Sequence, residues 1–149
     1  MSENRYSIII ERPVEQVFKY MDDVALETEW QPAIRSARAE PPGQTGVGTE
    51  KHYISEFMGR EVKNTYVAKV FEKNRRVVYE TTPKSTLQGT ATFTWERVES
   101  GTLVTMSVDG EPRGVLRLLP RGVLDRFYQN ELEATLHRLK NRLESNESN

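Results

Sequence analysis

Hydrophobic positions in the last third of the chain recur every three or four residues. The series is Leu124, Tyr128, Leu132, Leu136, Leu139 and Leu143. This spacing places apolar side chains along one side of an α-helix. We therefore predict one long helix from Leu116 to Glu144. A helix of this length needs a large apolar surface to cover, and the residues before it have to supply that surface.

The middle of the chain has a different period, because apolar and polar residues alternate there. Ala91, Phe93 and Trp95, for example, are separated by threonines. Such alternation is typical of strands with one buried face. The predicted strands cover residues 6–11, 34–39, 48–57, 61–71, 76–82, 88–98 and 102–110. The turns between the last five strands are short, so these neighbours should pair antiparallel.

Two short helices are predicted after the first strand. Pro13 suits the start of a helix, where its missing N–H is not needed, and the apolar spacing after it extends to Met21. Asp23 is a suitable cap for a second helix that reaches about Glu29. Pro32 ends this helix, because the residue before a proline avoids the helical conformation.

These elements indicate an α+β fold in which a seven-stranded antiparallel sheet wraps around the terminal helix. One face of the sheet is polar, so the helix covers the other face only. We expect a chamber between them, on the order of 300 Å³ or more. The 149 residues form one domain, 1–149, with a structured core at 6–144 and a polar tail at 145–149.

Composition narrows the functional classes. The chain has no cysteine, which excludes disulfides and thiolate chemistry. His52 and His137 are the two histidines, and neither lies at metal-ligand spacing from carboxylates, so we expect no metal and no cofactor. The net charge is -1 without a basic stripe, which argues against nucleic acid. No apolar run reaches the roughly 20 residues of a membrane span, and no signal sequence is visible, so we expect a cytoplasmic protein.

Several residues on the predicted inner faces are candidates for contact with a ligand. They are Tyr53, Phe57, Asn64, Tyr66, Tyr79, Phe93, Trp95, Met106 and Phe127. Asn64 either bonds to protein groups or orients a ligand, and we favour the ligand slightly. Lys51 also points inward, and we expect it to reach solvent rather than anchor an anion. Glu131 is a weak candidate for a general base, although a surface salt bridge is the simpler interpretation.

The order of several short motifs resembles the START-like, helix-grip (SRPBCC) superfamily, in particular its bacterial polyketide cyclase/dehydrase-type members. The matching segments are 11–18, 22–32, 46–49 and 111–119, with Glu131-Leu132-Glu133 and Leu139-Lys140 in register in the last helix. The resemblance covers about residues 6 to 144. It implies a seven-stranded sheet that grips the C-terminal helix, with two small helices closing one end. It implies no particular reaction, because members of this superfamily share no catalytic triad.

The first functional hypothesis is that the chain binds or transports a hydrophobic or amphipathic small molecule, such as a lipid, polyketide or quinone-like compound. A polyketide cyclase or dehydratase-type enzyme is the alternative, because such catalysis needs little more than positioning and one acid–base group. A second alternative is a module that binds a protein partner and has a filled interior. We expect a monomer or a weak dimer.

Overall fold

A computed structural model of the chain describes residues 2–43, 45–57, 59–112 and 118–145. Its strands are β1 (Ser2–Ile10), β2 (Ile34–Glu40), β3 (Glu50–Phe57), β4 (Arg60–Glu72), β5 (Arg76–Thr81), β6 (Leu87–Val98) and β7 (Gly101–Pro112). Its helices are α1 (Val14–Asp22), the 3₁₀ turn η1 (Val24–Leu26), α2 (Glu27–Trp30) and α3 (Arg121–Ser145). The predicted order of elements is confirmed.

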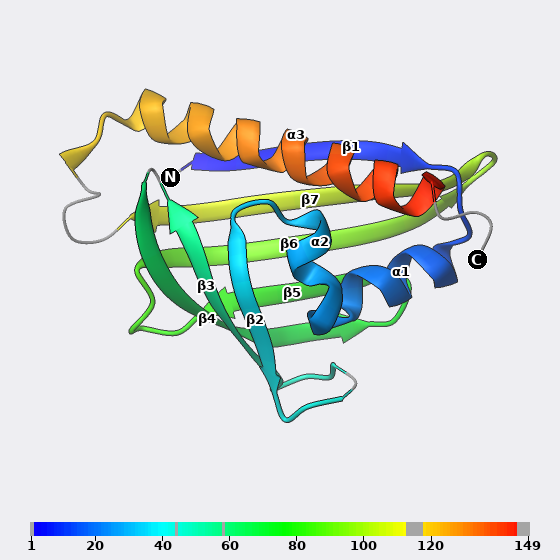
Figure 1. Cartoon of the computed structure of the whole chain (residues 1–149), viewed down its shortest axis with the longest axis horizontal. Coiled ribbons are helices and arrows are strands. Elements are labelled where there is room, and N and C mark those ends of the chain that lie inside the picture. Colours follow the sequence, from blue (N-terminus) through cyan, green and yellow to red (C-terminus); the bar gives the residue numbers. More distant parts are fainter. Residues whose placement is uncertain (1, 44, 58, 113–117, 146–149) are drawn as a thin grey trace.

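All seven strands form one antiparallel sheet in the order β1-β7-β6-β5-β4-β3-β2. The first strand of the chain thus lies beside the last, and β2 forms the other edge. Figure 1 shows α3 running along β1, with α1 and α2 grouped towards one end of the sheet. The predicted helix-grip architecture is confirmed.

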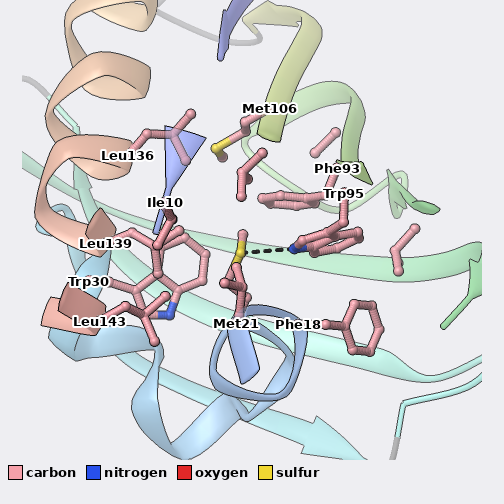
Figure 2. Close-up of a cluster of buried hydrophobic side chains, with 14 of the residues drawn as sticks. Ile10, Phe18, Met21, Trp30, Phe93, Trp95, Met106, Leu136, Leu139 and Leu143 are labelled. Atoms are coloured by element: carbon pink, nitrogen blue, oxygen red, sulfur yellow. Dashed lines mark hydrogen bonds between the residues drawn. The ribbon is translucent and has the colours of Figure 1, made fainter. Parts of the chain in front are cut away.

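The main hydrophobic core lies between the sheet, α1, α2 and the C-terminal half of α3. Figure 2 shows part of it, in which Leu139 and Leu143 of α3 lie near Trp30 of α2 and Leu136 lies farther along the helix. Phe18 and Trp95 meet edge to face, with ring centroids 4.7 Å apart. Burial of so many large apolar groups provides most of the stabilisation of this end of the molecule.

The N-terminal half of α3 packs in a separate, smaller cluster. Among the described residues, Val62 and Leu124 are its buried members. The partly buried members are Leu87, Leu119, Phe127 and Tyr128. Regions with few buried apolar contacts open at lower free energy than the main core. The two halves of α3 are therefore held against the sheet to different extents.

The long helix begins later than its spacing predicts. Its first residue is Arg121 instead of Leu116, and Leu118 to Pro120 are not α-helical; residues 116 and 117 lie outside the described residues. The reason is Pro120, which disfavours helical conformation in the residue before it. Its carbonyl accepts hydrogen bonds from the backbone N–H of Val123 and Leu124, so it begins the first turn. Strand β1 starts at Ser2 instead of Tyr6, because residues 2–5 pair with residues 107–110 of β7.

Candidate functional site

Two charged side chains are buried where α1 and α2 meet β3. Lys51 of β3 is 2 % exposed and Glu27 of α2 is 3 % exposed. The Lys51 Nζ lies 3.7 Å from Glu27 Oε2 and 3.8 Å from Asp22 Oδ1. The expectation that Lys51 reaches solvent is wrong, because the end of α1 and the start of α2 cover the inner face of its strand. We call Asp22, Glu27 and Lys51 the charged cluster.

The carboxyl group of Glu27 is also held by neutral donors. The Tyr53 hydroxyl donates to it, with Oη 2.8 Å from Oε1 and 3.1 Å from Oε2. Gln31 Nε2 donates to Oε1 at 2.7 Å. The ammonium of Lys51 lies farther away than either donor. Glu27 is therefore fixed in orientation by neutral hydrogen bonds and balanced in charge by Lys51.

Burial governs the protonation of this cluster. It raises the pKa of Glu27 to about 7, although Lys51 and the Tyr53 hydrogen bond lower it. Burial also raises the pKa of Asp22 against the attraction of Lys51. For Lys51, burial lowers the pKa, but its interactions with Glu27, Tyr79 and Asp22 outweigh this, so the pKa is raised overall. Lys51 stays charged at neutral pH, and the group that exchanges a proton there is Glu27.

A cavity of about 20 Å³ adjoins the charged cluster. Its walls are Met21, Asp22, Glu27, Trp30, Lys51, Tyr53, Val77, Tyr79, Phe93 and Trp95. We call it the Lys51 cavity. Its volume suffices for roughly one water molecule. The Trp95 indole N–H donates to Met21 Sδ at 3.2 Å (Figure 2), whereas the Trp30 Nε1 is buried without a hydrogen-bond partner among the described residues.

A second cavity, of about 30 Å³, lies under the N-terminal half of α3. Its walls are Tyr66, Thr81, Leu87, Gln88, Gly89, Thr90, Ala91, Val108, Gly110 and Tyr128. We call it the Tyr128 cavity. The Tyr66 ring lies edge to face with Tyr53, with centroids 5.7 Å apart. Because Tyr53 lines the Lys51 cavity and Tyr66 the Tyr128 cavity, this ring pair lies between the two cavities.

The aromatic residues predicted to line one chamber are divided between these places. Tyr53, Tyr79, Phe93 and Trp95 line the Lys51 cavity, and Tyr66 lines the Tyr128 cavity. Met106 belongs to the main core and Phe127 to the smaller cluster. The side chain of Phe57 lies outside the described residues. The Lys51 cavity and the Tyr128 cavity are thus each much smaller than the expected chamber. Rings such as Phe93 and Trp95, stacked 6.1 Å apart, fill the space.

Asn64 is bonded to protein groups. Its side chain is buried, and Oδ1 accepts from the backbone N–H of Thr86 at 2.8 Å and of Leu87 at 3.3 Å. These contacts tie the start of β6 to β4. We therefore assign Asn64 a structural role in place of the ligand contact that we favoured from the sequence.

Glu131 lies half-buried on α3, and burial raises its pKa. Within the described part of the chain it forms neither a hydrogen bond nor a salt bridge.

The two histidines are hydrogen-bonded to hydroxyl groups. His52 Nδ1 lies 2.9 Å from the Thr65 hydroxyl, and His137 Nε2 lies 2.9 Å from the Tyr6 hydroxyl. Across the same described ranges, no group of three acidic, histidine or cysteine side chains could hold a metal ion. None of the described helices is long and apolar enough to span a bilayer.

Sequence reasoning missed Glu27 and Trp30 as site residues. They are one helical turn apart, so they share a face of α2, and both are buried. A tryptophan in a short helix usually faces the core. The residue three positions before it then faces the core as well. That spacing was the available signal for a buried carboxylate.

The chain matches a protein-family model described as polyketide cyclase/dehydrase and lipid transport, over residues 1–144. No curated protein sequence gives a match. Among solved structures, TTHA0849 from Thermus thermophilus is similar, with a TM-score of 0.82, 18% identity, and coverage of 97% of this chain and 98% of that one. A START superfamily protein from Mycobacterium smegmatis has a TM-score of 0.79 at 13% identity and covers 96% and 97% of the two chains.

Because the sequence identities to these solved structures are only 18% and 13%, the similarity shows a shared fold but not a shared function. The family match extends over nearly the whole chain, which has the antiparallel sheet and the terminal helix described above. The chain therefore belongs to the family of polyketide cyclases/dehydrases and lipid-transport proteins, with a START-like fold.

Proposed function

We propose that this chain binds a hydrophobic or amphipathic small molecule between the sheet and α3, as a cytoplasmic monomer or weak dimer. The observation that carries the proposal is the charged cluster of Lys51, Glu27 and Asp22, buried beneath aromatic walls beside a cavity. Pockets for small molecules are mostly apolar with a few convergent polar groups. The family description, which includes lipid transport, supports the same class of function.

A filled interior, as in the partner-binding alternative, would not need the charged cluster. Replacing a buried ion pair by apolar side chains is often neutral or stabilising. The pair between Glu27 and Lys51 is therefore a poor device for stability alone. Perturbed pKa values of the kind found at Glu27 gather at functional sites. Both points favour a ligand site over a solid core.

Entry would occur at the N-terminal half of α3. A ligand of ordinary size needs more room than cavities of about 20 and 30 Å³ provide. Among the described residues, the small cluster around Leu124 is separate from the main core and has fewer buried members, so moving this half of α3 disturbs less of the buried core that they form. Displacing the ring of Tyr66, which lies with Tyr53 between the two cavities, would then join the Tyr128 cavity to the Lys51 cavity.

The test is displacement of a fluorescent hydrophobic probe from a matched pair of variants. Ala91→Leu adds bulk to the inner face of β6, where Ala91 lines the Tyr128 cavity. Thr92→Leu adds bulk at the next position, on the outer face. We expect Ala91→Leu to weaken probe binding about 10-fold while Thr92→Leu leaves it unchanged. Equal effects of both substitutions, or no binding by the unmodified protein, would contradict the proposal.

A second candidate function is catalysis of the cyclase or dehydratase type. It is favoured by one observation, the pKa of about 7 at Glu27, because a general base or acid works best near the operating pH. Glu27 is better placed for this than Glu131, since it lies against the Lys51 cavity. The test is turnover of a hydrophobic β-diketone, followed by absorbance. Loss of turnover in Glu27→Gln with probe binding retained would support an enzyme, and no turnover by the unmodified protein would exclude this reaction.

A further inference from the structure

We propose that the Lys51 cavity receives a hydroxyl group, so that the ligand is an apolar molecule ending in an alcohol or phenol instead of a carboxylate. This inference rests on the proposed binding function. It adds the chemistry of the ligand's polar end to that function. Three features of the charged cluster carry it: the spacing of its atoms, their unused hydrogen-bonding capacity and their net charge.

The spacing leaves a gap that one oxygen atom can bridge. The Lys51 Nζ lies 3.7 Å from Glu27 Oε2 and 3.8 Å from Asp22 Oδ1, beyond direct hydrogen-bond distance. Its hydrogen bond to the backbone oxygen of Asp22 is long, 3.5 Å, and the Tyr79 hydroxyl in the cavity wall is a further hydrogen-bond partner. Polar contacts across such distances are commonly bridged by water. The adjoining cavity has the volume of about one water molecule.

The unused capacity calls for a group that both accepts and donates. An ammonium group has three N–H donors; Lys51 directs one to the backbone oxygen of Asp22 at long range and one to the Tyr79 hydroxyl, which leaves one for a ligand. Glu27 Oε1 accepts from two donors, whereas Oε2 accepts a single hydrogen bond, of 3.1 Å, from Tyr53. A hydroxyl can accept from Lys51 and donate to Oε2. A ketone or ether oxygen can only accept, so it would leave the carboxylate oxygen without a new partner.

The net charge argues against an anionic ligand. The charged groups that face the cavity are Lys51, Glu27 and Asp22, contributed by β3, α2 and the end of α1. With both acids ionised their sum is -1, and a ligand carboxylate would make it more negative in a buried place. Burial raises the pKa of Glu27 and of Asp22, so the site already disfavours the ionised forms of these two acids. A neutral hydroxyl avoids this cost.

The remaining walls suit an apolar body attached to that hydroxyl. Met21, Trp30, Phe93 and Trp95 lie together on this side of the core, as Figure 2 shows, and all four line the cavity. Such side chains offer dispersion contacts and no further charge. The polar group is thus recognised at one point and the rest of the ligand by apolar burial.

The experiment compares ligands that each carry a chain of eight carbon atoms on the unmodified protein. Octanol, octyl methyl ether, octane and octanoate each compete with a fluorescent hydrophobic probe at about pH 8, where an octanoate carboxylate is ionised. We expect octanol to bind about 10-fold more tightly than the ether, which lacks the donor, and more tightly than octanoate. Octanoate binding as tightly as octanol, or equal affinity for octanol and the ether, would overturn the inference while leaving the binding function in place. Failure of the probe itself to bind would remove both.

Variants assign the preference to the cluster. The double variant Glu27→Gln/Lys51→Met removes both charges of the buried pair at once. Neither position then carries an unpaired charge, so we expect the double variant to fold. Its octanol affinity should fall about 10-fold and its affinity for the ether should change less than about twofold. Glu61→Gln with Lys63→Met, the same changes at exposed positions of β4, should alter neither affinity. An unchanged preference for octanol in the folded double variant would show that the charged cluster does not recognise the hydroxyl. The comparison of ligands on the unmodified protein does not depend on any variant.

Discussion

Tyr53 donates its phenolic hydrogen to Glu27, with Oη 2.8 Å from Oε1. The bond joins the inner face of β3 to the short helix α2, two elements that are 26 residues apart at this contact. Burial, followed by the charge of Glu27, raises the pKa of Tyr53 well above its ordinary value, so the phenol stays protonated and acts as a donor. The proton that exchanges near neutral pH therefore belongs to Glu27.

Glu27 should make the stability of the protein depend on pH. Its pKa in the folded protein is about 7, against an ordinary value of 4.5. Between these values the folded protein holds a proton that the unfolded chain has lost, so the free energy of unfolding falls as pH rises through this window. The fall should amount to at most on the order of 3 kcal/mol.

Urea unfolding of the unmodified protein and of Glu27→Gln at about pH 5 and about pH 8 measures this effect. In Glu27→Gln the free energy of unfolding should fall less as pH rises, because the contribution of Glu27 is lost. The contribution of Asp22 remains in both proteins. A difference between the two proteins that stays constant from the lower to the higher pH would show that Glu27 does not titrate in this window.

Removal of the Tyr53 hydroxyl should destabilise the protein and raise the pKa of Glu27 further. Tyr53→Phe takes away a hydrogen bond that lowers that pKa. We expect a loss of about 1–2 kcal/mol in the free energy of unfolding at neutral pH. Tyr6→Phe is the control, because the Tyr6 hydroxyl bonds to His137 at an exposed place. Chemical denaturation and an NMR titration of the Glu27 carboxyl carbon measure both quantities. An unmoved titration of Glu27 would mean that this hydrogen bond does not set its protonation.

Asn64 should matter for stability and not for binding. Asn64→Leu leaves the N–H groups of Thr86 and Leu87 without their acceptor, so we expect a loss of about 1–3 kcal/mol. Asn130→Leu, at an exposed position of α3, should change stability by less than about 0.5 kcal/mol. Thermal melts with and without a hydrophobic probe separate the two roles. A stable Asn64→Leu protein with weakened probe binding would restore the ligand role.

The two tryptophans should both report a ligand that reaches the Lys51 cavity. Trp30 and Trp95 are the two tryptophans of the chain, and both line that cavity. In Trp30→Phe only Trp95 emits, and in Trp95→Phe only Trp30 emits. Titration with octanol should change the emission of both single-tryptophan proteins at the same concentration. Binding that leaves both emissions unchanged would place the ligand elsewhere.

Much of the fold could be predicted from the sequence because its two hydrophobic periods are distinct. The spacing from Leu124 to Leu143 follows the helical period, and the alternation around Phe93 follows the strand period. Short turns then favour antiparallel neighbours. The helix start was misplaced because apolar residues before Pro120 continue the helical spacing, whereas the proline stops the helix from extending back through Leu118 and Leu119.

The site was harder to predict because its contacts join distant parts of the chain. Alternation places Lys51 on the inner face, but only the tertiary position of α2 shows that Glu27 covers it. Similarly, alternation turns Asn64 inward without showing that the backbone of Thr86 meets it. The size of the enclosed space depends on how rings such as Phe93 and Trp95 stack. Neither the helical nor the strand spacing of apolar residues contains information on ring stacking or on contacts between distant segments.

The most direct test of ligand binding is native mass spectrometry of the protein purified from its own host without detergent. Binding between the sheet and α3 predicts an added mass of one small apolar molecule per chain, with reduced occupancy in Ala91→Leu and unchanged occupancy in Thr92→Leu. The released molecule should carry a hydroxyl group and no carboxylate. The bare mass of the chain, together with an unchanged mass after incubation with octanol, would contradict the proposal that this protein is a binder of hydrophobic small molecules.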